Sequence, residues 1–265
     1  MKAIGACAGQ VGDIIMGTVF ARAHKQKYPE SHLVCGIADK YGFTAPLLEE
    51  NEFYDSVHIW DGYNDWPTAS DRLHIAQSEY DIVYNAMPQH TEPFWYLHRH
   101  QTAEMCLMHG LEPPENLQAS LSVNGERENN IIALSLFGVT RGEEKSCSVE
   151  QGKQIVELIR KLGYKPVQIG LVDEPSICED RFLSTLQGTA EFVKKSAALI
   201  TIDTAMAWIA SGFSHPTIGL YSYKYYPMAT TAKNWMPVNP NAIYLESNSV
   251  SNIISEKIEA AIKQL

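Results

Sequence analysis

The chain has 265 residues, of which 45% are hydrophobic, and its 31 acidic and 21 basic residues give a formal net charge of -10. This length allows two domains with ordinary cores, while the acidic balance disfavours stable nucleic-acid binding and leaves at most peripheral contact with an anionic membrane. Five cysteines without metal-ligand or redox spacing, and no apolar stretch near the roughly 20 residues that span a bilayer, indicate a cytoplasmic protein with reduced thiols.

The first half of the chain alternates short apolar runs with longer segments of helical character. Strands are expected at residues 2–8, 32–38, 56–60 and 80–85, and helices at 14–28, 47–50 and 95–110. The first helix is predicted to be amphipathic and to end before Pro29, because proline cannot continue a helix. Met105 and Met108 are expected in the core.

A polar, proline-containing stretch at 112–130 follows, with one expected strand at 119–123, and it indicates a domain boundary. We therefore expect domains at 1–124 and 125–265. The second half repeats the alternation, with strands expected at 131–136, 166–169, 198–202 and 217–221, and helices at 149–162, 189–195, 205–211 and 250–264. Ser148 and Gln151 predict a capping box at the start of the helix 149–162.

Two successive alternations of this kind predict an α/β protein with two facing Rossmann-like domains and an interdomain cleft. The last helix can also pack back onto the N-terminal domain. No solenoid repeat or low-complexity segment interrupts the pattern.

Gly12 and Asp13 lie where the first expected strand gives way to the first helix. A helix start offers unpaired N–H groups and a positive dipole end that suit a phosphate, but the charge of Asp13 repels one. A carboxylate at this place is better suited to accept a proton, so Asp13 is predicted to be a general base. The structural alternative is that Asp13 caps the helix.

A dinucleotide-binding fingerprint is a second interpretation of the same turn. Residues 7–12 follow an apolar run as that fingerprint does, and Asp39 after the second apolar run could bind a ribose. However, Cys7 replaces the first glycine, which the tight turn requires, and Asp13 opposes the approach of a pyrophosphate. These departures disfavour an oxidoreductase.

Three blocks in chain order resemble those of the ADP-heptose lipopolysaccharide heptosyltransferases and their relatives, which form glycosyltransferase family nine. The first is 12–18, followed by Tyr28-Pro29 and by 51–57; the second is 138–140 with Lys145 and Glu150; the third is 196–210, continuing to Gly212, Pro216 and 219–221. The chain departs from the family at Cys147-Ser148, which replaces Trp-Pro, at Ala205-Met206, which replaces Gly-Pro, and at Trp208, which replaces histidine.

The resemblance implies the GT-B fold, an N-terminal acceptor domain and a C-terminal donor domain. It implies inverting, metal-independent transfer of a sugar from a nucleotide-diphosphate sugar to a glycan hydroxyl, with no cofactor and with Asp13 as base. The implied donor-binding residues are Gly138, Thr140, Lys145, Glu174, Asp203, Thr204, Ala205 and Met206, and the implied acceptor-binding residues are Gly12, His90, His98 and Arg99. The N–H groups of Thr204, Ala205 and Met206 would face the leaving diphosphate at a helix start.

Structural roles compete with several of these assignments. Lys145 stands beside two glutamates and could belong to a solvated charged loop, Asp203 could cap the following helix, and Glu174 could lie on an acidic surface turn. The basic residues Arg22, His24, Lys25 and Lys27 could form a local patch, but cations that complement the end of the first helix are expected there. His98, Arg99 and His100 are not predicted to bind a metal, because no carboxylate or cysteine accompanies them.

Three other functions compete with a glycan transferase. The departures in the second and third blocks suit a non-catalytic nucleotide-sugar binding module. Similar scaffolds also support sugar-nucleotide epimerisation, and phage-type transferases that modify DNA bases share the two-domain architecture. The net charge of -10 disfavours the DNA-modifying function.

Overall fold

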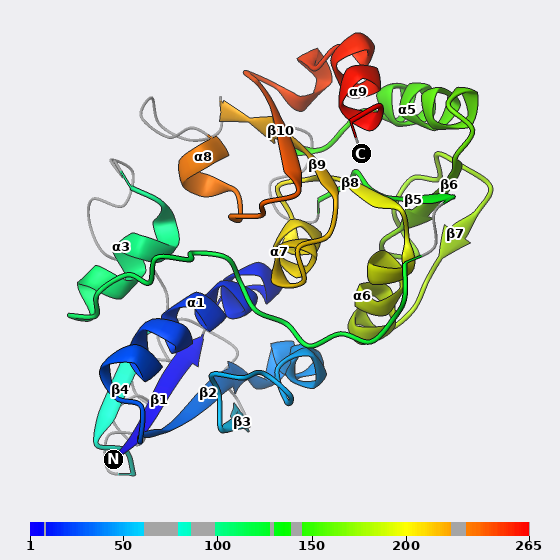
Figure 1. The fold of residues 1–265 in the computed structure, drawn as a ribbon. Coiled ribbons are helices and arrows are strands. Elements are labelled where there is room, and N and C mark those ends of the chain that lie inside the picture. Colours follow the sequence, from blue (N-terminus) through cyan, green and yellow to red (C-terminus); the bar gives the residue numbers. More distant parts are fainter. Residues whose placement is uncertain are drawn as a thin grey trace. The chain divides into compact units, whose positions relative to one another are not determined.

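The computed structural model describes residues 1–7, 9–60, 79–85, 99–127, 130–138, 145–223 and 232–264. These residues form two compact units, Met1–Ser122 and Val123–Leu265, each built on a parallel sheet (Figure 1). The expected α/β class with two Rossmann-like units is confirmed. The two units divide after residue 122, where the sequence analysis expects the boundary after residue 124.

The N-terminal unit contains a four-stranded sheet in the order β3-β2-β1-β4. Its strands are β1 (Lys2–Cys7), β2 (His32–Ala38), β3 (Ser56–Trp60) and β4 (Ile82–Asn85), and its helices are α1 (Val11–Lys27), α3 (Gln101–Met108) and the 3-10 helix η1 (Asp39–Leu47). Helix α1 packs on β1 and on α3, and its Phe20 ring lies edge-on to Tyr84 of β4. Strands β2 and β3 have the predicted bounds.

The C-terminal unit contains a six-stranded sheet in the order β10-β9-β8-β5-β6-β7. Its strands are β5 (Ile131–Ser135), β6 (Lys165–Ile169), β7 (Arg181–Phe182), β8 (Ala198–Ile202), β9 (Thr217–Ser222) and β10 (Ala242–Ser247). Its helices are α5 (Val149–Lys161), α6 (Leu186–Lys195), α7 (Ala205–Gly212), α8 (Ala232–Trp235), α9 (Ser255–Ile262) and the 3-10 helix η5 (Val250–Asn252).

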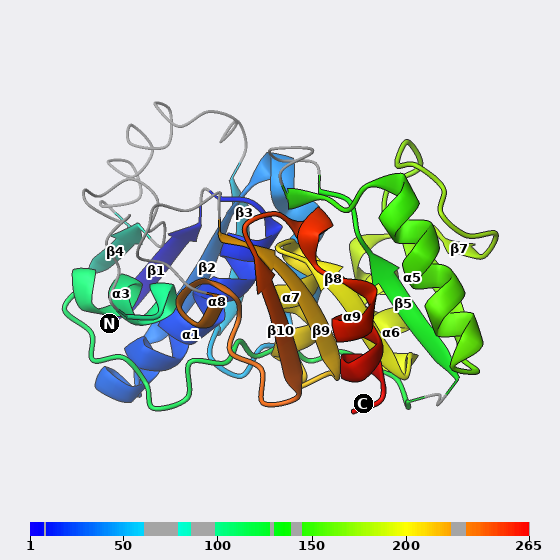
Figure 2. The same ribbon diagram turned by 90° about the horizontal axis from the view of Figure 1, so that it is seen from above.

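Helices cover both faces of this second sheet (Figure 2). Helices α5 and α9 pack together on one face, over a core that includes Ile132 and Ile200. Helices α6 and α7 pack on the other face, over Ala133 and Leu199. Successive residues of one strand thus point to opposite faces, which is why β5 and β8 are continuous apolar runs. Helix α9 also contacts β9 and β10 of its own unit.

Each sheet has one place where the strand order reverses. In the N-terminal unit the chain adds β2 and β3 on one side of β1 and then places β4 on the other. In the C-terminal unit it adds β6 and β7 beside β5 and then places β8 on the opposite side. The carboxyl ends of strands that flank such a switch point form a crevice where α/β proteins bind ligands. The pairs β1/β4 and β5/β8 therefore locate one candidate site in each unit.

The start of α1 differs from the sequence expectation. The helix begins at Val11 rather than at residue 14, so Gly12 and Asp13 belong to its first turn. The residues from Ile14 to Ala21 are all buried, which is the pattern of a helix that is apolar on every side. The prediction of an amphipathic helix is wrong for this reason.

The expected strand at 119–123 is also wrong, because residues 112–127 form no helix or strand. Side chains of the N-terminal unit hold this segment instead. The Arg22 guanidinium donates to the carbonyl oxygens of Asn116 at 2.6 Å and Gln118 at 2.8 Å, and the Asn51 amide donates to the carbonyl of Ser120 at 2.8 Å. Backbone carbonyls that pair with side chains leave no ladder for a strand.

Other differences concern the ends of elements. The helix expected at 47–50 is replaced by η1, which ends at Leu47, and the final helix is broken between η5 and α9. Strands β7 and β10 and helix α8 were not predicted. Met105 is buried as expected, whereas Met108 is exposed.

The capping box at α5 is half present. The Ser148 hydroxyl accepts the Gln151 N–H at 3.1 Å, but the Gln151 amide donates to the carbonyl oxygens of Val250 and Ile253 instead of reaching back. Gln151 therefore ties α5 to η5. Among the described residues, no helix is long and apolar enough to cross a membrane.

Candidate functional site

The loop after β5 brings Lys145 back to the switch point of the C-terminal unit. The Cys147 N–H donates to the carbonyl of Leu136 at 3.0 Å, and the Gly138 N–H donates to the Ser146 hydroxyl at 3.0 Å. These two bonds close the loop at its base, so that Lys145 stands beside the end of the strand although it comes ten positions after Ser135 in the chain. Thr140 lies outside the described residues.

Lys145 forms an ion pair with Asp203, the residue that directly follows β8. The Lys145 Nζ lies 2.6 Å from Asp203 Oδ2, and the two side chains are 17% and 14% exposed. Strands β5 and β8 are paired neighbours, which explains why their carboxyl ends bring these two groups together. The alternative that places Lys145 in a solvated charged loop is wrong, because the ammonium group is paired and largely buried.

The helix that follows Asp203 begins without a side-chain cap. Thr204 is the N-cap residue of α7, and its hydroxyl lies 3.1 Å from the Thr201 hydroxyl rather than on a helix N–H. The alternative role of Asp203 as cap is therefore wrong. The first N–H groups of a helix have no acceptor within the helix, so those of Ala205 and Met206 give this end a positive partial charge.

The β5/β8 switch point consequently combines an ammonium group with a helix N-terminus. Together they provide the donors and the positive potential that a diphosphate requires. The Asp203 carboxylate balances the Lys145 charge, so that the pair alone has no net charge. The arrangement can offer donors to an anion while the ion pair itself adds no excess of positive charge.

Glu174 lies at the same edge of the sheet, after β6. Gly170 has a φ of +155°, and an ideal Cβ at that position would be 2.0 Å from Glu174 Oε2. The carboxylate of Glu174 therefore folds over the Gly170 backbone, and its half-buried position raises its pKa, an effect that Arg181 opposes. The structure places Glu174 beside β6, the strand next to β5.

Asp13 is the third residue of α1, at the switch point of the N-terminal unit. Its Oδ2 accepts the N–H of Gln10, the N-cap residue, at 2.9 Å, and its side chain is partly buried. Asp13 thus is not the N-cap, as the structural alternative held, but it supports the cap from the first turn. Gly12 shares that turn.

The expected acceptor residues are only partly described. His90 and His98 lie outside the described residues, and Arg99 is exposed just before α3. His100 is the N-cap of α3, because its Nδ1 accepts the Thr102 N–H at 3.3 Å, so the helix begins at Gln101 and not at residue 95.

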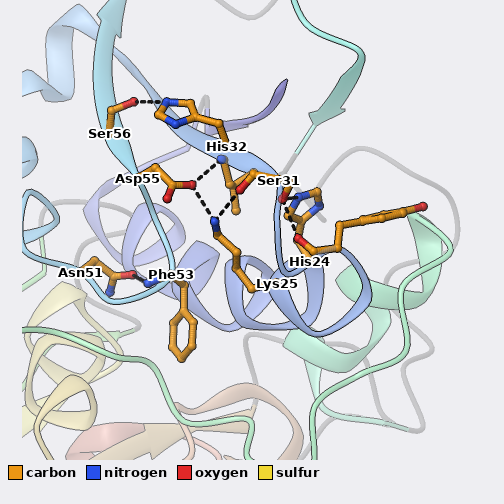
Figure 3. Close-up of polar contacts among 10 residues, drawn as sticks. His24, Lys25, Ser31, His32, Asn51, Phe53, Asp55 and Ser56 are labelled. Atoms are coloured by element: carbon orange, nitrogen blue, oxygen red, sulfur yellow. Dashed lines mark hydrogen bonds and ion pairs between the residues drawn. The ribbon is translucent and has the colours of Figure 1, made fainter. Parts of the chain in front are cut away.

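The basic residues near the end of α1 do not form a patch for a polyanion. Figure 3 shows Lys25 between Asp55 and Ser31, with its Nζ 2.6 Å from Asp55 Oδ2 and 2.6 Å from the Ser31 carbonyl oxygen. His24 is fully buried, its Nε2 lies 2.7 Å from the Ser31 hydroxyl, and burial lowers its pKa to about 4. His24 is thus a neutral side chain and not a cation at a helix end.

One contact of the C-terminal site was missed by the sequence analysis. The indole Nε1 of Trp235, at the end of α8, lies 3.3 Å from Asp203 Oδ2, the oxygen that also binds Lys145. These two residues are 32 positions apart, and no motif links them. Trp208, which stands where the family has histidine, is buried.

The described residues contain no group of three or more His, Cys, Asp or Glu side chains that could hold a metal ion. Cys35, Cys106, Cys147 and Cys178 are buried and unpaired with one another. Burial raises the pKa of Cys35, Cys106 and Cys147 to about 12, so these thiols are poor nucleophiles at neutral pH.

Solved structures share this fold over the whole chain. A glycosyltransferase family 9 protein from Veillonella parvula has a TM-score of 0.74 at 16% identity, over 99% of this chain and 96% of that one. The E. coli ADP-heptose lipopolysaccharide heptosyltransferase II has a TM-score of 0.71 at 13% identity, over 99% and 97%. The chain has the fold of family 9 glycosyltransferases. The E. coli heptosyltransferase WaaC, solved with ADP, is similar at a TM-score of 0.70 and 12% identity, over 100% and 99%.

Sequence comparison alone finds no counterpart. No protein-family profile matches the chain, and no curated protein matches it in sequence. The resemblance to family 9 is therefore confirmed through the fold, at sequence identities of 12% to 16%.

Proposed function

We propose that the protein is an inverting glycosyltransferase that moves a sugar from a nucleoside-diphosphate sugar to a hydroxyl group of a glycan, without a metal ion or cofactor. The observation that carries the proposal is the ion pair of Lys145 with Asp203 at the β5/β8 switch point, directly before the N-terminus of α7. The fold supports it, because its neighbours include ADP-heptose heptosyltransferases and one of them was solved with ADP. A cytoplasmic role in lipopolysaccharide biosynthesis is part of the same proposal.

The donor diphosphate would lie against Lys145 and against the N–H groups of Ala205 and Met206. An ammonium group has three donors, so Lys145 can bind Asp203 and a phosphate oxygen at the same time. Negative charge develops on the diphosphate as the sugar leaves, and fixed donors at that place lower the barrier. Gly138, Thr140, Glu174 and Thr204 complete the proposed donor site.

Asp13 would take the proton of the acceptor hydroxyl as that oxygen attacks the anomeric carbon. The bond to the diphosphate oxygen breaks on the opposite face, so the configuration inverts and the proton remains on Asp13 Oδ1 or Oδ2. A partly buried carboxylate at a helix start, fixed by the Gln10 N–H, is positioned rather than mobile. Gly12, His90, His98 and Arg99 are the proposed acceptor residues.

The test is a panel of nucleoside-diphosphate sugars and glycan acceptors, with products detected by mass spectrometry. We expect transfer with at least one donor in the presence of a chelator, and a product of inverted anomeric configuration by NMR. A requirement for added metal, or a product of retained configuration, would contradict the mechanism.

A non-catalytic nucleotide-sugar binding module is the second candidate, and the sequence at α7 favours it. Ala205 and Met206 replace the glycine and proline of the family, and the buried Trp208 replaces its histidine. Tight binding of a nucleotide sugar without transfer or hydrolysis across the panel would support this candidate over the enzyme.

A further inference from the structure

Trp235 is linked to the candidate donor site by a single polar atom. Its indole Nε1 lies 3.3 Å from Asp203 Oδ2, and the Lys145 Nζ lies 2.6 Å from the same oxygen. One carboxylate oxygen therefore accepts both a neutral N–H and an ammonium N–H. The three side chains come from the loop after β5, the end of β8 and α8, which are separate parts of the C-terminal unit.

The ring of Trp235 is fixed by packing. It lies against a buried cluster made by Ala207 of α7, Tyr221 of β9 and Met236, together with Tyr244 of β10. Ala207 belongs to the first turn of α7, so the ring contacts the same helix whose N-terminus contributes to the site. Because the ring is partly buried among these neighbours, its N–H has a defined direction and can orient the carboxylate.

We propose that Trp235 is a positioning residue for the donor diphosphate, acting through Asp203 on Lys145; this inference rests on the proposed donor site. A carboxylate and the flexible lysine bound to it can rotate together, and each donor that is fixed in direction restricts this rotation. The second donor, held by the aromatic cluster, fixes the direction of Oδ2 and thereby the place of Nζ. A neutral N–H does this without adding a charge that would compete with Lys145 for the phosphate oxygens.

The test is a double-mutant cycle between Trp235→Phe and Lys145→Ala, with ADP and inorganic pyrophosphate as probes in titration calorimetry. We expect Trp235→Phe to weaken both probes about tenfold, in keeping with the loss of a hydrogen bond to a charged group. In the Lys145→Ala background the same change should have no further effect, because the residue acts through the lysine. Tyr244→Phe, which alters the same cluster without touching Asp203, should bind like the unmodified protein.

A loss on Trp235→Phe that adds to the loss on Lys145→Ala, or no loss at all, would overturn the positioning role. If Trp235→Phe does not fold, benzothienylalanine at position 235 gives the same comparison, because it replaces only the N–H with sulfur. A non-additive cycle measured with pyrophosphate supports the positioning role whether or not any donor sugar is transferred. If the cycle is non-additive but no donor supports transfer, only the proposed transferase function is contradicted. If the unmodified protein binds neither probe, the positioning role and the donor site fail together.

Discussion

The two units present acidic side chains near their switch points, at different positions and with different partners: Asp13 is the third residue of α1, and Asp203 precedes the N-cap of α7. Asp13 follows β1 and accepts a neutral backbone N–H in the first turn of α1, whereas Asp203 follows β8 and accepts an ammonium and an indole N–H. The ion pair balances the charge of Asp203, so that an anion can approach the start of α7. The Gln10 N–H holds Asp13 Oδ2 in the first turn of α1, where the side chain is partly buried. The two acidic residues thus have different structural roles, one in the first turn of a helix and one in an ion pair beside a helix start.

The largest expected effect is the loss of turnover when Asp13, the acidic residue of the N-terminal unit, is replaced by asparagine. Asp13→Asn retains an oxygen that can accept the Gln10 N–H, so α1 should keep its start, but the amide cannot take a proton. We expect kcat to fall about 1,000-fold, within the range for loss of a general base. Donor affinity should change less than about twofold, because the expected donor site lies in the C-terminal unit.

Asp39→Asn is the matched control for that variant. Asp39 is an exposed carboxylate that follows β2 at the same edge of the sheet. Its replacement should leave transfer unchanged. Steady-state kinetics on both variants decide the assignment: unaltered turnover in Asp13→Asn removes Asp13 from the chemistry, and a loss in Asp39→Asn would favour a nucleotide site in the N-terminal unit.

The units resemble each other in their buried histidines, which predicts a loss of stability in mild acid. His24 and His215 each lie beside a serine hydroxyl, at 2.7 Å and 3.1 Å, and burial lowers the pKa of both to about 4. The unfolded chain, with a histidine pKa near 6.5, binds protons first as the pH falls. Stability should therefore be full above pH 6.5 and decline toward pH 4, by about 2 kcal/mol per histidine between pH 7.5 and 5.

Urea unfolding at several pH values measures this decline. His24→Gln and His215→Gln should each flatten the pH dependence, since glutamine does not titrate, while His32→Gln should leave it unchanged because His32 is exposed. If the free energy of unfolding of His24→Gln and of His215→Gln depends on pH as steeply as that of the unmodified protein, the two histidines are not the groups that take up the protons.

A smaller effect, on the affinity for ADP and pyrophosphate, is expected when one lysine of each unit is replaced by alanine. Lys145 and Lys25 form ion pairs of the same length, 2.6 Å, with Asp203 and Asp55. Lys145→Ala should weaken ADP and pyrophosphate by about 10- to 100-fold, because a charged hydrogen bond is lost and Asp203 then repels the phosphates. Lys25→Ala should leave both affinities unchanged. Equal affinities in the two variants would show that the diphosphate does not bind at Lys145 beside the β5/β8 switch point.

The sequence predicted those parts of the fold that depend on local pattern. Strands β2, β3 and β8 were predicted at their observed bounds, because β2 and β8 are largely apolar runs and β3 alternates polar and apolar residues. Strand β10 was missed, since it is only partly buried at the edge of its sheet, and so was the two-residue β7. Edge strands carry weaker apolar patterns because one side of their ladder is open.

The candidate site was predictable only where a residue stands next to a strand end. Lys145 and Asp203 were both selected from their blocks, and the pairing of β5 with β8 brings them together. The contact of Trp235 depends on the return of the chain from β9 through α8, which no local pattern encodes. The acceptor and donor roles of the two units remain predictions.

The smallest expected effect is on donor affinity when Gly170 is replaced by alanine, and it tests the proposed role of Glu174 in donor binding. Gly170→Ala introduces a Cβ that would meet the Glu174 carboxylate at 2.0 Å, at a φ of +155° that disfavours side chains. Gly163→Ala is the control for backbone strain without a steric clash. Gly163 has a φ of +86°, and no atom lies within 4 Å of a Cβ built at that position. Each variant should lose about 1–2 kcal/mol of stability from backbone strain. Only Gly170→Ala should also displace Glu174.

Calorimetry with two probes separates the strain from the displacement. If Glu174 contacts the ribose of the donor, Gly170→Ala should weaken ADP several-fold while leaving pyrophosphate unchanged, because pyrophosphate has no ribose. Glu174→Ala should have the same selectivity, and combining the two changes should add little, since both remove one contact. A loss of ADP affinity in Gly163→Ala of equal size would assign the effect to strain, and equal losses for both probes would place Glu174 at the phosphates instead.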